Sequence, residues 1–492
     1  MSSSPLNHSL RPLAAMVMAF TLSACTLGPD YSRPDLPLAT EFKQAEGWKV
    51  AAPADILQRS DWWTLYGDAE LNALVGRLNV SNQNLAAAEA QYRQARALAQ
   101  GARSQLFPTL GGSAGATRGG QGGSSSSTLQ NSSTGRGISE SYSVGLDASW
   151  ELDVWGRLRR NLEANRANMQ ASAADMAAVR LSLQSQLVQT YLQLRVMDEQ
   201  QRLLNQTVDA YARSLRLTEN QYRAGIVPRS DVSQALTQLR STEAQAIDLR
   251  WQRAQMEHAI AVLIGVPPAE LNIGEREYIP DIPQVPLALP SQLLERRPDI
   301  ASAERQVIAA NAQIGVAEAA WFPDLTLNAS GGYRNSSFSD LVSLPNRVWS
   351  LGPQLAVTLL DFGGRRANLE AAEASYDQTV ASYRQTVLDS FREVEDNLVQ
   401  LRVLADEAVV QQQALEAAEE SLRLIQNQYR AGTVDFLSVA TVQTTTLNNQ
   451  RTYLTLLGDR LAASVQLIAA LGGGWDETQL EQEPVLEATP PR

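Results

Sequence analysis

Two stretches of the chain run for more than sixty residues without a proline or a glycine, at residues 157–222 and 365–429. At 1.5 Å per residue, a helix of that length extends for about 100 Å, whereas helices of globular proteins average about 11–12 residues. Apolar side chains recur along the first stretch at steps of three and four, as at Leu183, Leu187 and Tyr191. This spacing indicates the seam of packed helices. We therefore expect an elongated coiled-coil assembly.

The sequence contains two copies of one unit. The block Glu-Asn-Gln-Tyr-Arg-Ala-Gly at 219–225 returns as Gln-Asn-Gln-Tyr-Arg-Ala-Gly at 426–432, an offset of 207 residues. Further upstream, Phe107-Pro108 returns as Phe322-Pro323, an offset of 215 residues. The difference of eight residues falls in a Gly/Ser-rich tract after Pro108, where a loop of variable length is expected. Each copy predicts a helix, two strands joined by a loop, a long helix, a tight turn and a further helix.

Four segments are expected to form strands: three alternate between an apolar face and a face of polar or small residues, and the first along the chain is weaker and made of small residues. They cover residues 109–118, 140–152, 324–333 and 349–361. In the second segment Leu146 and Trp150 share one face, and Asp147 and Ser149 share the other. A length of about ten residues fits a tilted transmembrane strand. It also fits a strand of an ordinary half-buried sheet, so the strands alone leave both interpretations open.

Four membrane strands cannot close a barrel, because the smallest outer-membrane barrels have eight strands. An open sheet edge in lipid leaves backbone groups unpaired, and each unpaired group costs several kcal/mol. If the strands span a membrane, the chain must therefore oligomerise. Two, three or four copies supply eight, twelve or sixteen strands, and this arithmetic does not choose among them.

The N-terminus has the pattern of an export signal. Arg11 precedes a short apolar run at 13–22, which is too short to span a bilayer as a helix. The run ends in Leu22-Ser23-Ala24-Cys25, which resembles a bacterial lipobox. We expect residues 1–24 to be removed and Cys25 to carry a diacylglycerol thioether and an N-acyl chain. Thr26 would then be the second mature residue, which by resemblance to sorted lipoproteins favours the outer membrane.

The composition excludes several functional classes. Asp and Glu number 53 against 41 Lys and Arg, a net charge of −12, which argues against a nucleic-acid partner. The chain has one cysteine, Cys25, and two histidines, His8 and His258, of which only His258 lies outside the predicted signal peptide. A Cys/His zinc site, an internal disulfide and a histidine-based catalytic site are therefore not expected. The sequence also shows no phosphate-binding Walker loop. We expect no enzymatic activity, metal or cofactor apart from the covalent lipid.

Taken together, these features resemble the TolC-type outer membrane channels. The shared features are the lipobox, the following Leu27-Gly28-Pro29-Asp30-Tyr31, the duplicated strand–strand–long-helix unit and the twin Tyr-Arg-Ala-Gly turns. The similarity is greatest to the lipoprotein branch that serves drug-efflux pumps of the resistance-nodulation-division class. The resemblance implies a homotrimer with a 12-stranded antiparallel transmembrane β-barrel, continuous with a 12-helix periplasmic α-barrel. It also implies a periplasmic adaptor protein and an inner-membrane pump as partners.

The resemblance also sets the expected organisation of the chain. It comprises a signal peptide at 1–24, a lipid-anchored equatorial segment at 25–65, a first repeat at 66–270, a connector at 271–290, a second repeat at 291–475 and a tail at 476–492. The expected long helices span 156–223 and 230–265 in the first repeat, and 365–430 and 436–471 in the second. The non-repeated pieces would form a belt around the middle of the helical tunnel.

The two Tyr-Arg-Ala-Gly turns are the candidate functional region. Gly225 and Gly432 stand where a left-handed residue ends a helix, and Asp435 is placed to cap the next helix. By resemblance these turns form the periplasmic tip, where the tunnel closes and the adaptor docks. Good helical hairpins that serve no gating purpose would show the same residues.

The family's gate motif carries over only in part. By position after the glycine, Asp231 matches a carboxylate that holds the tip closed through a bond to a tyrosine, here Tyr429. The family's basic partner falls on Val434, so that salt bridge is absent. The positions of acidic rings in relatives fall on Ser438 and Thr441, so those rings are absent as well.

The leading interpretation is a passive exit duct in the outer membrane for drugs or other small molecules. The outer membrane component of a type I protein secretion system is the alternative, against which the lipobox argues. A lipid-anchored coiled-coil rod without a pore is the more distant alternative, and the apolar faces of the four strands argue against it.

Overall fold

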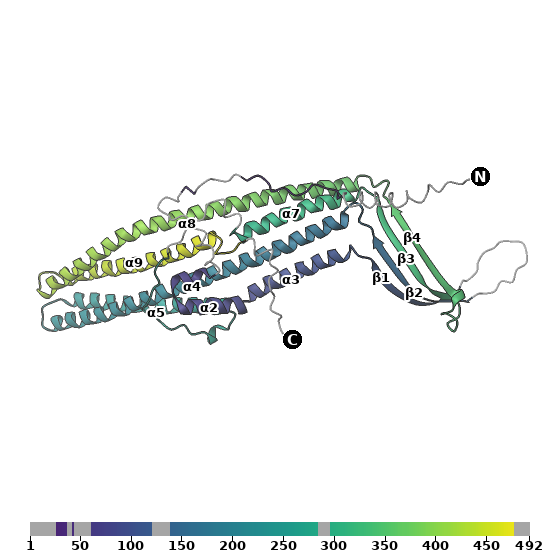
Figure 1. The fold of residues 1–492 in the computed structure, drawn as a ribbon. Coiled ribbons are helices and arrows are strands. Elements are labelled where there is room, and N and C mark those ends of the chain that lie inside the picture. Colours follow the sequence, from purple (N-terminus) through teal and green to yellow (C-terminus); the bar gives the residue numbers. More distant parts are fainter. Residues whose placement is uncertain (1–25, 37–41, 44–60, 121–137, 284–295, 477–492) are drawn as a thin grey trace, which may run out of the picture. The chain divides into compact units, whose positions relative to one another are not determined.

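The structure is a computed structural model that describes residues 26–36, 42–43, 61–120, 138–283 and 296–476 (Figure 1). It divides into two compact units. The first, here called the sheet unit, draws on Met1–Pro34, Arg93–Gln170 and Glu304–Ala381. The second, the hairpin unit, draws on Asp35–Tyr92, Ala171–Ala303 and Ser382–Arg492. The expected signal peptide and Cys25 lie outside the described residues.

The helices come in pairs of equal length. The pairs are α3 (Gln83–Ser104) and α7 (Pro298–Ala319) with 22 residues each, α4 (Arg157–Arg223) and α8 (Gly364–Arg430) with 67 each, and α5 (Arg229–Leu263) and α9 (Phe436–Ala470) with 35 each. A shorter helix, α2 (Ala69–Ser81), follows a 3-10 turn at Trp62–Tyr66. α4 contains no proline or glycine, and α8 contains only the glycine at its first position, which explains why neither helix breaks.

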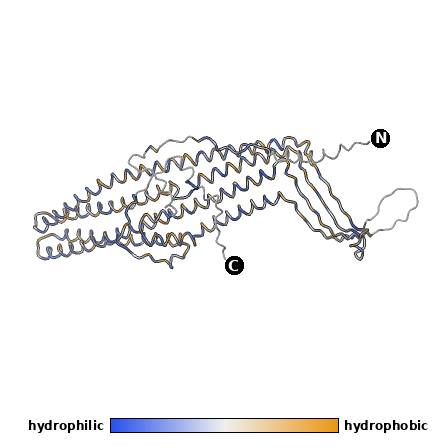
Figure 2. The backbone as a smooth tube through the Cα atoms, viewed as in Figure 1, coloured by the Kyte–Doolittle hydropathy of each residue, from blue (hydrophilic) through white to orange (hydrophobic). Residues whose placement is uncertain are grey.

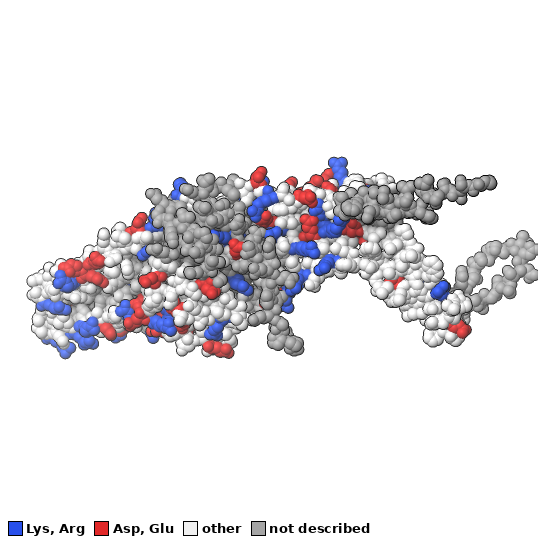
Figure 3. All heavy atoms as spheres, in the orientation of Figure 1, with Lys and Arg blue, Asp and Glu red and all other residues white. Residues whose placement is uncertain are grey.

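The sheet unit contains a four-stranded antiparallel sheet in the order β1-β2-β3-β4. The strands are β1 (Thr109–Gly120), β2 (Ile138–Glu151), β3 (Asp324–Asn335) and β4 (Arg347–Ala356). Hydrophobic and hydrophilic residues alternate along them (Figure 2), and the visible face of the sheet is almost free of charge (Figure 3). Large apolar side chains stand exposed on one face, including Leu146 at 59% and Trp349 at 72%. Within one chain, nothing in the described residues covers this face.

The last strand is shorter than the sequence predicts. Apolar alternation continues to Leu359 and the sequence predicts a strand to residue 361, but β4 ends at Ala356. The reason is the register, because Ala356 pairs with Asp324, the first residue of β3. Beyond Ala356, β3 offers no further residue to pair with, so the predicted end at 361 is wrong. Alternation reports which side chains share a face, whereas the end of a strand depends on its partner.

The core of the hairpin unit is built from aromatic and aliphatic side chains of several elements. Trp62, Tyr66, Leu187 and Tyr191 are almost fully buried within it. The Tyr66 hydroxyl lies 2.8 Å from the Ser464 hydroxyl of α9 and hydrogen-bonds with it. The 3-10 turn before α2 is thereby fixed on the helices, and the last residues of the expected equatorial segment include the buried Trp62.

A buried charge network fixes the chain after α5 to the helices. Arg195 of α4, with no exposed surface, donates to Asp198 at 2.8 Å, to Glu70 of α2 at 2.7 Å and to the Gly274 carbonyl at 2.8 Å. Arg253 of α5 donates to the other oxygen of Asp198 at 2.6 Å. Buried charges persist only when paired and hydrogen-bonded, so this geometry holds together α2, α4, α5 and the connector.

In the sheet unit, residues 26–34 form a strap that crosses α4 and α7. The guanidinium of Arg160 donates to the carbonyl oxygens of Leu27 at 3.0 Å and Gly28 at 3.1 Å, and to Asp30 at 2.8 Å. Burial disfavours the charge on Arg160, but its bonds to Asp30 and Glu163 raise its pKa above the ordinary value. Because the Asp30 side chain is 93% exposed, this ion pair contributes little. The two carbonyl bonds carry more of the attachment.

The other side of the strap binds α7. Asn311 donates to the Pro29 carbonyl at 2.8 Å, and Arg33 forms a bidentate pair with Glu304. Gly28 adopts a φ of 91°, and a Cβ there would overlap the Cα of Gly315 in α7. Only glycine permits this backbone approach. The Leu27-Gly28-Pro29-Asp30 sequence is therefore the docking motif of the strap.

Replacing Arg160 with alanine should detach the strap. The change removes the donors to two carbonyl groups and leaves those groups poorly satisfied, at a cost of about 1–3 kcal/mol in docking. Limited proteolysis followed by mass spectrometry should show faster cleavage within residues 26–36. Arg166→Ala is the matched control, because Arg166 lies on the same helix with an exposed side chain. Equal protection in the two variants would contradict the assigned role of Arg160.

Candidate functional site

The two long helices end in turns of the same geometry. Gly225 and Gly432 adopt φ angles of 73° and 72°, as predicted. In the first turn, the Ile226 amide donates to the Gln221 carbonyl and the Gly225 amide to the Tyr222 carbonyl, both at 2.9 Å. The second turn repeats both bonds at 3.0 Å. This is the Schellman arrangement, which satisfies the last carbonyl groups of a helix and requires a left-handed residue.

The helices that follow the turns begin differently. Pro228 precedes α5 and provides no side-chain cap, whereas Asp435 caps α9 by accepting from the Ser438 amide at 3.0 Å. The Ser438 hydroxyl also donates to Asp435 at 2.6 Å, and these two bonds lower the pKa of Asp435. Thr441 donates its hydroxyl to the Leu437 carbonyl at 2.9 Å. The two positions without the family's acidic rings are thus neutral and bonded within α9.

A small apolar cluster joins the two hairpins next to the turns. Its buried members are Ala235 of α5, Tyr429 of α8, and Phe436, Val439 and Ala440 of α9. The rings of Tyr429 and Phe436 meet edge to face at 5.7 Å, which is a favourable aromatic geometry. Val434 packs against the cluster. The position expected to lack the family's basic residue therefore contributes an apolar contact.

The phenol of Tyr429 links the second hairpin to the first. Its hydroxyl donates to Gln221 Oε1 at 2.7 Å and lies 3.3 Å from the Thr218 hydroxyl, both on α4. The equivalent tyrosine of the first copy, Tyr222, is 44% exposed, whereas Tyr429 is 5% exposed. The duplicated motif has therefore diverged, and only its second tyrosine is used as a contact between the hairpins.

Asp231 is not the hydrogen-bond partner of Tyr429 within the chain. Its carboxylate accepts from the Ser230 hydroxyl at 3.2 Å, in the first turn of α5. Burial raises the pKa of Tyr429, the Thr218 bond lowers it, and the negative charge of Asp231 raises it again. Asp231 is thus near enough to disfavour a phenolate, but Gln221 occupies the acceptor position. The Asp231–Tyr429 bond of a closed tip stays a prediction.

Sequence reasoning missed Gln221 and Thr218. The signal for Gln221 lay in the duplicated block, which is identical from its asparagine to its glycine and so includes the residue before each tyrosine. Thr218 lies outside that block. Its role depends on the spacing of one helical turn between 218 and 221, which places both side chains on one face of α4.

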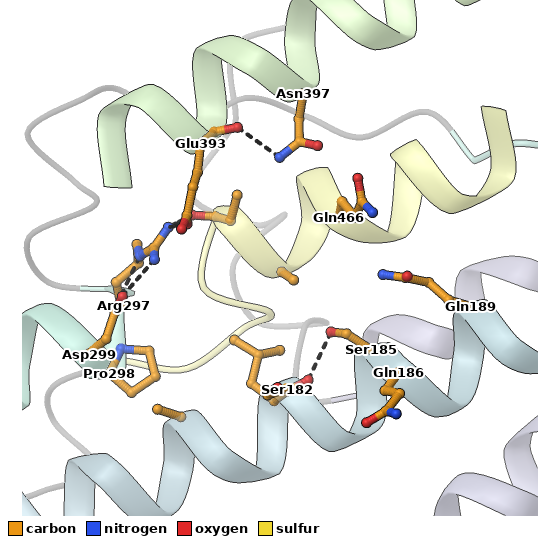
Figure 4. Close-up of a pocket in the computed structure, with 14 residues that line it drawn as sticks. Ser182, Ser185, Gln186, Gln189, Arg297, Pro298, Asp299, Glu393, Asn397 and Gln466 are labelled. Atoms are coloured by element: carbon orange, nitrogen blue, oxygen red, sulfur yellow. Dashed lines mark hydrogen bonds and ion pairs between the residues drawn. The ribbon is translucent and has the colours of Figure 1, made fainter. Parts of the chain in front are cut away.

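A cavity lies elsewhere in the hairpin unit, among α4, α7, α8 and α9 (Figure 4). Its volume is about 630 Å³. Arg297 bonds with Asp299 at 2.6 Å, with Glu393 at 2.8 Å and with the Ala470 carbonyl at 3.1 Å. Burial disfavours its charge, but these carboxylates raise the pKa of Arg297. Because the charged groups bind one another, they do not converge on the cavity as a ligand site requires.

Among the described residues, no three His, Cys, Asp or Glu side chains are grouped to hold a metal ion. None of the described helices has both the length and the apolarity needed to cross a membrane.

A sheet with an exposed apolar face, combined with paired hairpins of long helices, defines a protomer of the outer-membrane channel class. The sequence profile of the outer membrane efflux protein family matches residues 74–266 and 289–473. The chain belongs to this family, and it is an outer membrane protein that serves as an efflux channel of tripartite pumps.

The similarity to known proteins extends over almost the whole chain. The pyoverdine export outer membrane protein OpmQ of Pseudomonas aeruginosa is 34% identical over 470 residues, covering 95% of this chain and 98% of its own. The cation efflux system protein CusC of Escherichia coli O6:H1 is 30% identical over 470 residues, covering 94% and 99%. The solved structure of the outer-membrane channel OprN superposes with a TM-score of 0.84 at 32% identity, covering 92% of this chain and all of that one.

Tyr429→Phe should loosen the contact between the hairpins without disturbing the apolar cluster. The ring stays, but Gln221 loses its donor, at a cost of about 0.5–1.5 kcal/mol. Hydrogen exchange of the amides at the ends of α4 and α8 should therefore accelerate about two- to tenfold. Tyr222→Phe is the matched control, and Asp231→Asn should leave the exchange nearly unchanged. An equal response to Tyr429→Phe and Tyr222→Phe would contradict the assignment.

Proposed function

We propose that three copies of the chain form one passive exit duct, with a 12-stranded barrel and a 12-helix tunnel. The observation that carries the proposal is the four-stranded sheet, whose outer strands β1 and β4 each have one partner in the chain. Lipid tolerates no open sheet edge, so β1 of one copy pairs with β4 of the next. The family resemblance favours three copies over two or four. The equal helix pairs support two structural repeats per chain.

The duct acts without catalysis. In this proposal an inner-membrane pump of the resistance-nodulation-division class supplies the energy, and a periplasmic adaptor protein docks at the tip formed by the two turns. The names of the relatives, a cation efflux protein and a pyoverdine exporter, support small solutes as the cargo. Protein export by a type I secretion system is the second candidate, and the lipobox argues against it.

We also propose that the tip closes the duct at rest. Within each copy, Tyr429 and Gln221 hold the two hairpins together. Asp231 and Tyr429 are the proposed closing pair, in which the single hydroxyl proton of Tyr429 turns from Gln221 to the Asp231 carboxylate. Ser438 and Thr441 supply no acidic rings, and Asp435 uses its carboxylate to cap α9. Closure therefore depends on packing and on the charge-assisted bond from Tyr429 to Asp231 more than on bound cations.

Purified protein should have the mass of a trimer in detergent and should form channels in planar bilayers. Because Tyr429→Phe and Asp231→Asn each remove a contact that holds the tip closed, each should raise single-channel conductance, and the double variant should add little to either. Tyr222→Phe controls for the loss of a phenol. A stable monomer in detergent, or intact trimers without conductance, would exclude the duct and leave the rod without a pore.

Cys25→Ala with an ordinary signal peptide should still give trimers in the membrane. Each buried CH₂ of an acyl chain contributes about 0.8 kcal/mol, but a closed barrel buries the apolar faces of all its strands. Mass spectrometry of the wild-type N-terminal peptide should show the diacylglycerol thioether and the N-acyl chain on Cys25. Complete loss of the variant from the membrane fraction would refute the barrel as the main anchor.

A further inference from the structure

The polar face of the sheet carries very few charged side chains. The register places alternate residues of each strand on this face, and they are mostly serine, threonine, glycine and amides. Among the described strand residues on this face, the charged ones are Asp147, Glu151, Asp324 and Arg334. If the apolar face meets lipid, this face lines the barrel, and its charges act on whatever passes through.

Asp147 stands apart from the other three because its row of paired residues crosses all four strands, and its neighbours in that row are small and neutral. It pairs with Gly111 on β1 and Ser330 on β3, and Ser330 pairs in turn with Ser350 on β4. The two serine hydroxyls bond each other at 2.9 Å. A Cβ on Gly111 would lie 2.6 Å from Asp147 Oδ2, so the carboxylate occupies the space that the glycine leaves. Asp147 is exposed and has no ion pair with any described residue.

The remaining charges lie at the two ends of the strands. Glu151 is held by Arg157 at 2.7 Å, and Asp324 is the first residue of β3. Arg334 lies four residues along β3 from Ser330, the partner of Asp147, which is about 13 Å at the rise of a strand. The Debye length at 0.1 M salt is about 10 Å. Arg334 therefore does not cancel the field of Asp147 at ordinary ionic strength.

We propose that Asp147 is the residue that makes the barrel prefer cations. Three copies place three carboxylates at one level of the lumen, and their field enriches hydrated cations and cationic solutes while it depletes anions. Ser438 and Thr441 supply no acidic rings at the tip, where the Asp231 and Asp435 carboxylates accept from the Ser230 and Ser438 hydroxyls. The inference rests on the proposed trimeric channel, and it assigns the selectivity of that channel to the barrel.

Asp147→Asn tests the charge at almost constant size. In a KCl gradient near 0.1 M, the reversal potential of trimers in a planar bilayer should show a permeability ratio of K⁺ to Cl⁻ lowered about two- to fourfold. Near 1 M the Debye length falls to about 3 Å, and the difference between wild type and variant should almost vanish. Glu140→Gln is the matched control, because Glu140 lies on the same strand on the opposite face, paired with Arg118 at 3.3 Å.

A second variant, Asp147→Cys, allows a charge to be restored at this position by chemical modification. The chain has one cysteine, Cys25, so Asp147→Cys introduces a single thiol in the lumen. Methanethiosulfonate reagents convert that thiol to a mixed disulfide. The thiol loses its proton to water, the new S–S bond forms, and methanesulfinate leaves. A sulfonate reagent should restore the cation preference and a trimethylammonium reagent should reverse it, whereas Ala148→Cys on the apolar face and the wild-type chain should not respond.

The outcomes separate this inference from the proposed function. A wild-type trimer without conductance refutes the channel itself. A conducting wild type whose selectivity is unchanged by Asp147→Asn, and by both reagents on the Asp147→Cys variant, refutes the role of Asp147 and leaves the channel intact. A shift of equal size in Glu140→Gln also refutes it, because the selectivity would then follow net charge rather than position.

Discussion

The hydrogen-bonding demand of the sheet edges is the constraint on which the rest of the molecule depends. β1 and β4 each present an unpaired row of N–H and C=O groups along one side, and a bilayer offers no water to satisfy them. A single chain has no solution to this demand within its described residues. In the proposed trimer, copies of the same chain meet this demand by joining edge to edge.

Duplication has produced two hairpins with the same frame and different details. Both turns keep the glycine and the same two backbone bonds, because any other residue would strain the left-handed conformation. The side chains around this frame have diverged. Tyr429 is buried against Phe436 while Tyr222 remains exposed, and Asp435 caps a helix whose counterpart begins after Pro228. The two hairpins therefore share one backbone geometry, and their different side chains allow the second hairpin to contact the first.

Much of the fold could be read from local chemistry. Gly225 and Gly432 ended helices as predicted, because the left-handed conformation is a property of the residue itself. The end of β4 was wrong, because it depends on a partner strand and not on β4 alone. At the tip, the sequence predicted the position of Asp231 after the turn. It did not predict the acceptor of the Tyr429 hydroxyl, because the packing of two facing helices decides between Gln221 and Asp231. The buried pairing of Arg195, Arg253 and Asp198 was equally hidden, since it includes backbone carbonyl groups of the connector.

The strap is synthesised early but binds residues that are synthesised much later. Its residues leave the ribosome before any of the described helices, and Pro29 binds Asn311, a residue 282 positions later. Arg33 binds Glu304, 271 positions later. Arg160 of α4 is available to the strap early, but the bonds to α7 form only after α7 of the second copy has been made. The attachment of this early segment is therefore complete only after most of the chain has been synthesised.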